Sequence, residues 1–181
     1  MTRVVRDNGD GPDWTKRPRA LALPPMQRLL KFGHTMGAIG LMGALACLLV
    51  LDHLAPPPSD LKSFALMRGA MAEITTWVLF PSLLLTLAPG LLSLSVTPAF
   101  HNAGWVWAKA ASGILVFAGG LHVAGPLQDL GRQSAEALAG RLDPATLAES
   151  IAPGEARTMW MLLAVSTANV VLGIWRGRIL R

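Results

Sequence analysis

Four apolar stretches, each about as long as a membrane is thick, constrain the fold of this chain most strongly. They lie at residues 29–54, 70–96, 104–124 and 157–176. A helix of roughly 20 residues crosses about 30 Å of hydrocarbon, because each residue adds about 1.5 Å. Only 15% of the 181 residues are charged, against about 25% in an average soluble domain. We therefore predict an all-α membrane protein, a bundle of four transmembrane helices.

The positions of the basic residues predict how this bundle is oriented. Seven Lys and Arg residues precede or open the first stretch, and three close or follow the last one. The first loop holds two. In the loop after the third stretch, counted through Arg157, three Arg residues are outnumbered by five Asp and Glu residues. Basic residues concentrate on the cytoplasmic side of membrane proteins. We expect both termini in the cytoplasm, the first and third loops in the periplasm, and a location in the bacterial inner membrane.

A single membrane domain is expected to fill most of the chain. Residues 1–25 combine Gly, Pro and mixed charges, which predicts a mobile cytoplasmic tail. Residues 26–181 form the membrane domain, with a periplasmic loop at 125–156. Within that loop, leucines recur at near-helical spacing between residues 134 and 149, which predicts either a short amphipathic helix on the membrane surface or a solvated connector.

Prolines mark where the expected helices end or bend. The run at residues 55–58, Ala-Pro-Pro-Pro, ends the first helix, because proline lacks an N–H group and clashes with the preceding turn. Pro81 and Pro89 lie inside the second stretch, where neighbouring helices can satisfy the carbonyl groups that proline leaves unpaired. We expect kinks at both positions.

Small residues line one face of the first stretch. Gly33, Gly37, Gly40 and Gly43 recur every three or four residues. Such a stripe lets the backbone of another helix approach closely. The alternative is that the stripe makes room for a flat cofactor, with Gly37 against it.

Two ionisable residues are expected near the cytoplasmic end of the bundle. His34 lies about one turn inside Lys31, and Lys109 lies a little over one turn inside Gly104, so both have a similar depth. Each has an ordinary explanation, since Lys109 can extend to the interface and His34 can bond a neighbouring helix. The functional interpretation joins them: an imidazole and a neutral amine on two facing helices can be the axial ligands of a haem.

A second polar group is expected at the periplasmic end. Asp52 and His53 end the first stretch, Glu73 begins the second, and His122 ends the third. The side chains of His53, His122 and Glu73 would suit copper or another transition metal. Solvation of these residues by water and lipid headgroups is the alternative.

Several classes of function have no support in the sequence. It contains no Ser/His/Asp set and no HExxH, CxxC, Walker or GxGxxG motif, which argues against hydrolases, metalloproteases, thiol-redox proteins and nucleotide binding. Basic residues are not interleaved with aromatic ones as in nucleic-acid-binding proteins. The expected surroundings are the bilayer itself and a membrane electron carrier, a larger membrane complex or further copies of the chain.

Three segments in order carry a family resemblance: LLKFGHTMGAIGLMGALACLLVLDH, ITTWVLFPSLLLTLAPGLLSL and GWVWAKAASGILVFAGGLH. The pattern is a Lys-x-x-His opening of the first helix, a second helix that starts through Thr and Pro, and a Gly-Trp-x-x-x-Lys opening of the third. The residues that match it are Lys31, His34, Thr75, Thr76, Pro81, Gly104, Trp105 and Lys109. Over these three stretches the chain resembles the bacterial HemJ-type protoporphyrinogen oxidases and the related HemJ/CopD-like membrane proteins.

The resemblance implies a function as well as a fold. It implies that His34 and Lys109 bind haem b and support activity, with Trp105 beside the cofactor. The reaction would be the oxidation of protoporphyrinogen IX to protoporphyrin IX, with electrons leaving through the haem to another membrane carrier. Two other interpretations stay open: a non-catalytic accessory or assembly subunit of a respiratory or photosynthetic complex, and CopD-like copper handling at the periplasmic side.

Overall fold

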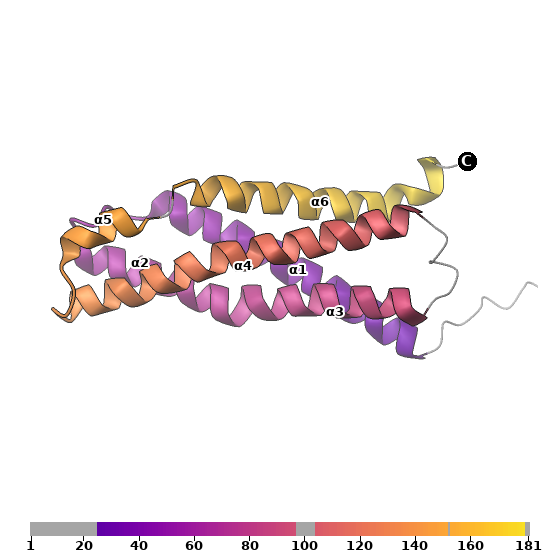
Figure 1. Ribbon diagram of the computed structural model, residues 1–181, viewed down its shortest axis with the longest axis horizontal. Coiled ribbons are helices and arrows are strands. Elements are labelled where there is room, and N and C mark those ends of the chain that lie inside the picture. The colour runs from indigo at the N-terminus through magenta and orange to yellow at the C-terminus, as the bar shows by residue number, and fades with distance from the viewer. Residues whose placement is uncertain (1–24, 97–103, 152, 180–181) are drawn as a thin grey trace, which may run out of the picture.

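The structure is a computed structural model that describes residues 25–96, 104–151 and 153–179, without the side chains at 94–96, 104–106 and 174–179. Within these residues the chain is helical and contains no strand (Figure 1). The predicted tail falls almost wholly on residues 1–24, which lie outside the described residues.

Four helical crossings build the bundle. The second is a composite of two helices joined by a π-helical turn, and a short 3-10 turn with the one-turn helix α5 connects the third to the fourth. The elements are α1 (Pro25–Leu54), α2 (Leu61–Ile74), η1 (Thr75–Leu79), α3 (Phe80–Val96), α4 (Gly104–Leu138), η3 (Pro144–Thr146), α5 (Leu147–Ser150) and α6 (Glu155–Ile179). Each crossing is long and apolar enough to span a membrane, which confirms the predicted four-span all-α fold.

The helices lie side by side along one long axis. α1 packs against α3 and α6, and α4 packs against α2, α3 and α6, so α1 and α4 occupy opposite corners of the bundle. The beginning of α1 and the end of α6 lie at the same end of the molecule (Figure 1). The opposite end, which carries α5, is called the α5 end below.

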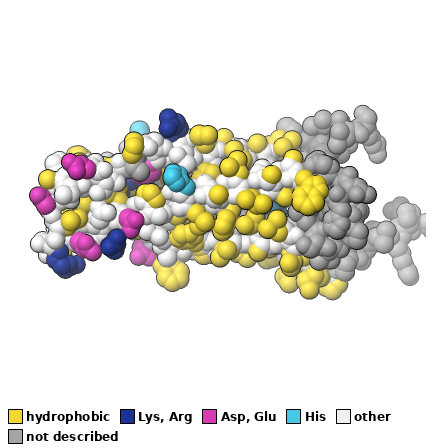
Figure 2. Space-filling model, viewed as in Figure 1, with side chains coloured by type: hydrophobic (Ala, Val, Ile, Leu, Met, Phe, Trp, Pro, Cys, Tyr) yellow, Lys and Arg dark blue, Asp and Glu magenta, His cyan; other side chains and the backbone are white. Residues whose placement is uncertain are grey.

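Apolar side chains cover the outside of the bundle along its middle (Figure 2). Trp77, Leu115 and Trp160 are examples, with 74%, 63% and 61% of their surface exposed. A monomeric soluble protein rarely exposes so continuous an apolar surface, whereas a bilayer provides an apolar surrounding for it. On the face shown in Figure 2, the coloured acidic and basic side chains gather towards the α5 end.

α4 extends beyond the end predicted for the third span. The sequence predicts a loop from residue 125, whereas α4 continues through Pro126 to Leu138, and α2 begins beside it at Leu61. The end of α4 and the beginning of α2 form a second small core. Its buried members are Phe64, Leu130, Ala137 and Leu147. The segment expected to form an amphipathic helix or a connector consists of the end of α4, the turn η3 and α5. The many charged residues in this segment made its apolar face difficult to recognise in the sequence.

The prolines act partly as predicted. α1 ends at Leu54, immediately before the Pro-rich run, which confirms that prediction. Pro81 follows the π-helical turn, in which the N–H of Phe80 donates to the carbonyl of Thr75. Pro81 has no N–H to donate within a helix. A π-helical turn just before it tolerates this, because its hydrogen bonds already depart from the regular pattern in which each N–H donates to the carbonyl four residues earlier. Pro89 lies inside α3 without ending it.

Three of the four glycines in the stripe, Gly33, Gly37 and Gly40, lie at the contact between α1 and α3. A Cβ atom on Gly37 would lie 2.5 Å from the backbone nitrogen of Thr86 and 2.6 Å from the carbonyl carbon of Leu85. A Cβ atom on Gly40 would collide with the hydroxyl of Ser82. Helix packing therefore explains this part of the stripe, and α3 fills the space that a flat cofactor would need.

Gly37→Ala is expected to separate α1 from α3, because the added methyl group would meet backbone atoms that cannot move aside. The expected loss of stability is about 1–3 kcal/mol, the usual cost of overpacking. Gly43→Ala is the matched control, since a Cβ atom there would have no neighbour within 4 Å. Thermal unfolding of the purified protein in detergent would measure both variants, and equal midpoints would contradict this packing.

Candidate functional site

His34 is fixed against α3 by a hydrogen bond. Its Nδ1 lies 2.7 Å from the carbonyl oxygen of Thr86, and its side chain is partly buried. A carbonyl oxygen only accepts hydrogen bonds, so Nδ1 is the donor and carries the proton. In the neutral imidazole, Nε2 then holds the lone pair that can bind a metal.

A glycine beside a proline allows this arrangement. A Cβ atom on Gly90 would lie 3.3 Å from Nδ1 and 3.5 Å from Cε1 of His34, so the imidazole lies against bare backbone. Pro89 has no N–H to donate to the carbonyl of Leu85, so one regular helical hydrogen bond is missing next to Thr86. Sequence reasoning missed Thr86 and Gly90, although the Pro-Gly pair inside an apolar stretch was a usable signal.

Lys109 lies in a different seam, between α4 and α6. Its Nζ is 3.2 Å from the position that a Cβ atom on Gly173 would occupy. One turn further along α4, Ser112 Oγ donates to Asn169 Oδ1 at 2.9 Å. Hydrogen bonds between polar side chains commonly join helices in membranes.

The described contacts do not bring His34 and Lys109 together. His34 contacts α3, Lys109 reaches α6, and their own helices occupy opposite corners of the bundle. The side chain of Trp105, predicted to lie beside a cofactor, is outside the described residues.

The three residues predicted for copper do not form a group that is placed to hold a metal ion. Glu73 is exposed and accepts a hydrogen bond of 2.9 Å from Nε1 of Trp77, one turn further along. His53 and His122 are exposed as well. Across residues 25–96, 104–151 and 153–179, no group of three or more His, Cys, Asp or Glu side chains is placed to hold a metal ion.

Among the residues that the structure describes, the most buried charge belongs to Arg68, which joins three helices at the α5 end. Arg68 is only 4% exposed, and its Nη1 lies 3.3 Å from Asp52 Oδ1 on α1 and 3.3 Å from Glu155 Oε1 on α6. Its guanidinium also lies 5.5 Å from the centre of the Phe64 ring, within range of a cation–π contact. Burying an arginine is costly unless partners surround it, so the three residues stabilise one another only as a set.

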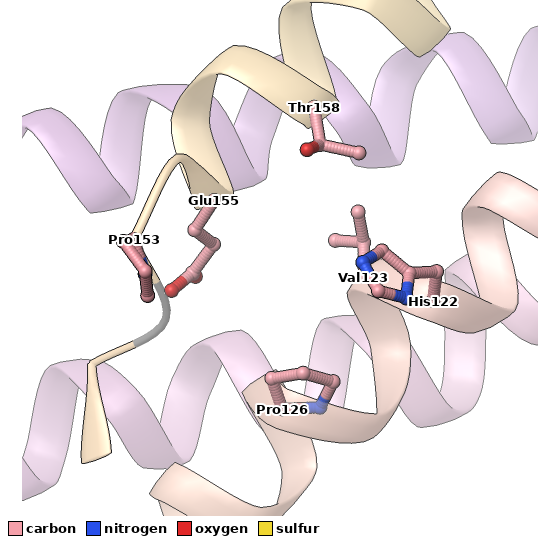
Figure 3. A pocket seen from close by; sticks show the side chains of 6 residues that line it. All are labelled: His122, Val123, Pro126, Pro153, Glu155 and Thr158. Atoms are coloured by element: carbon pink, nitrogen blue, oxygen red, sulfur yellow. The ribbon is translucent and has the colours of Figure 1, made fainter.

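A small hollow adjoins this cluster. Its volume is about 40 Å³, and its lining is His122, Val123, Pro126, Pro153, Glu155 and Thr158. Figure 3 shows the side chains of His122, Glu155 and Thr158 bordering the same open space. Glu155 thus contacts Arg68 and also borders a water-sized space.

Sequence reasoning missed the roles of Arg68 and Glu155, because the predicted spans began at residues 70 and 157. Both were counted as loop charges for the orientation. The signal was present in the spacing, since Phe64 and Met71 stand four residues before and three after Arg68 and place apolar surface on its face of a helix.

Comparisons with protein-family models, with curated proteins and with solved structures find no match for this chain. The HemJ-like resemblance therefore depends on the motif residues alone.

Arg68→Gln is expected to destabilise the protein strongly, because it leaves the Asp52 and Glu155 carboxylates buried without a cation. Removing one partner of a buried ion pair costs about 3–5 kcal/mol. Arg132→Gln is the control, since Arg132 pairs with Asp129 at the surface, and such pairs contribute about 0–1 kcal/mol. Chemical unfolding in detergent would compare them, and an Arg68 variant as stable as the Arg132 variant would contradict the structural role of the cluster.

Proposed function

We propose that this chain is an integral membrane protein that binds haem b through His34, near the end of the bundle opposite α5. The observation that carries the proposal is the hydrogen bond from Nδ1 of His34 to the carbonyl of Thr86. Histidines that bind metals almost always donate their other ring N–H to a carboxylate, a carbonyl or water, which fixes the tautomer and the ring orientation. His34 has this arrangement within an apolar bundle.

The residues around His34 fit a bound haem in part. His34 supplies an imidazole with Nε2 available by its tautomer, and Gly90 leaves the ring undistorted. Gly37 does not fit a place beside the macrocycle, because α3 already packs on it. A bound haem would therefore contact His34 away from the contact between α1 and α3.

Lys109 is the candidate second ligand of the haem iron, because it matches the Gly-Trp-x-x-x-Lys motif. Its position beside Gly173 means that it would have to turn from α6 towards His34 to share one iron. The experiment below therefore tests the two residues separately.

The proposed role is redox or porphyrin chemistry of the HemJ type. Haem b, when bound, supplies one-electron transfer, and the resemblance extends this to the oxidation of protoporphyrinogen IX with a membrane carrier as acceptor. The protein's own part is to hold the imidazole in one tautomer and to keep the site in an apolar surrounding, both of which tune an iron centre.

The proposal includes the location and orientation of the protein. We place it in a bacterial inner membrane with both termini in the cytoplasm. Arg28 and Lys31 are exposed at the beginning of α1, and basic residues favour the cytoplasmic side. The acidic residues that Figure 2 shows near the α5 end would then face the periplasm.

A second candidate is a non-catalytic accessory or assembly subunit of a larger membrane complex. The favouring observation is the filled contact between α1 and α3, where Gly37 and Gly40 meet α3 directly. Such a bundle is packed along this face without any cofactor. Further copies or other membrane subunits would then contact its apolar outer surface.

Purification from haem-replete cells, a visible spectrum and a pyridine haemochrome assay test the first candidate. We expect a Soret band and haem b, and loss of the band in His34→Ala. His53→Ala is the matched control, because His53 is exposed at the other end of the same helix. Gly90→Val should weaken haem binding too, since its side chain would push the imidazole away from Thr86.

The outcomes separate the candidates. If Lys109→Ala retains the Soret band, Lys109 is excluded as a haem ligand and His34 remains the proposed ligand. A colourless protein, stable and well folded, would overturn haem binding, and co-purification with respiratory or photosynthetic subunits would then favour the accessory role.

A further inference from the structure

The carboxylate of Glu155 lies between a buried cation and a space large enough for water. Its side chain is only 6% exposed and lies 3.3 Å from Nη1 of Arg68. It also lines the hollow that His122 and Thr158 border (Figure 3). Ionisable groups placed within a membrane bundle commonly mark proton or ion pathways.

The charges around Glu155 do not balance when all of them are ionised. Arg68 brings one positive charge to two carboxylates, Asp52 and Glu155, and the same Nη1 atom contacts both. Two carboxylates that share a site resist simultaneous ionisation. A proton on one of them leaves a neutral cluster, in which Arg68 pairs with the other.

Glu155 is better placed than Asp52 to take this proton. The side chain of Asp52 is 20% exposed, so water stabilises its charge more than that of Glu155, which is 6% exposed. Glu155 also lines the hollow, which Asp52 does not. The proton would therefore rest on Glu155, while Asp52 remains the partner of Arg68.

A second observation indicates that water belongs in this cluster. Nε of Arg68 is buried and has no hydrogen-bond partner within the protein. An unsatisfied buried donor of this kind usually bonds an ordered water. The hollow beside it is lined by Glu155 and not by Arg68, and its volume of about 40 Å³ exceeds the roughly 10–15 Å³ that one water needs. Water in the hollow would give the Glu155 carboxylate a partner for proton exchange.

His122 provides a link from the hollow to the outside. It is exposed on α4 and borders the hollow together with Glu155, and an imidazole nitrogen can accept or release a proton. Among the described residues, the charged and titratable groups that face Glu155 are Asp52 from α1, Arg68 from α2 and His122 from α4. Arg157, on α6 itself, folds back over Gly154.

We propose that Glu155 is a proton-binding site that takes up and releases protons from the aqueous phase at the α5 end, through the hollow bordered by His122 and Thr158. The proton comes from water or from the His122 imidazole, binds a Glu155 carboxylate oxygen and returns by the same route. No electron transfer is involved, and the site does not depend on haem binding.

Infrared difference spectroscopy of the full chain in lipid nanodiscs, recorded while pH is lowered, tests this proposal. We expect the C=O band of a protonated carboxylic acid, and we expect Glu155→Gln to lose it. Glu73→Gln is the matched control, because Glu73 is an exposed glutamate on a neighbouring helix, and it should leave the band unchanged. Circular dichroism would verify that both variants are folded.

Two further variants test the electrostatics and the route. Asp52→Asn removes the competing negative charge, so the Glu155 band should develop only at more acidic pH. His122→Ala should slow the rise of the band after a rapid pH change without removing it. Absence of the band in the unsubstituted protein, its persistence in Glu155→Gln, or equal loss in both glutamate variants would overturn the proposal.

Discussion

The close contact between α1 and α3 is the interaction on which the rest of the bundle depends. Gly37 and Gly40 let the two backbones meet, and this sets His34 at the depth of Thr86 and Gly90. In lipid, apolar side chains gain little by leaving one apolar surrounding for another, so close packing and hydrogen bonds carry the association. The position of the histidine is therefore a result of glycine packing within the next two turns of α1.

The two ends of the bundle are stabilised by different physics. Near His34 the contacts are backbone to backbone, with one hydrogen bond from a side chain to a carbonyl. At the α5 end, Arg68 gathers carboxylates from two other helices, and Phe64 belongs to a second small core beside it. Charges can be buried there because Arg68 contacts both carboxylates, and because the hollow beside Glu155 gives access to water.

The sequence predicts the four spans well, because hydropathy and helix length are local properties. It also predicts the end of α1 from its prolines and offers helix packing as one reading of the glycine stripe. It fails where partners decide the outcome: Arg68 and Glu155 read as loop charges, since their neutralisation depends on helices far apart in the chain. Equal depth alone does not say which neighbour each side chain faces: His34 contacts α3, whereas Lys109 lies beside Gly173 on α6.

The π-helical turn η1 lets the two halves of one membrane crossing pack against different helices. Before it, α2 packs on α4, and after it, α3 packs on α1. A single extra residue turns the following face of a helix by about 100°. Removing one residue between 75 and 79 would restore a regular helix and rotate α3 relative to α2, so that Ser82 and Thr86 would point away from the glycines of α1. The turn thus rotates the packing face of α3 relative to that of α2, so that one continuous crossing contacts α4 with its first half and α1 with its second.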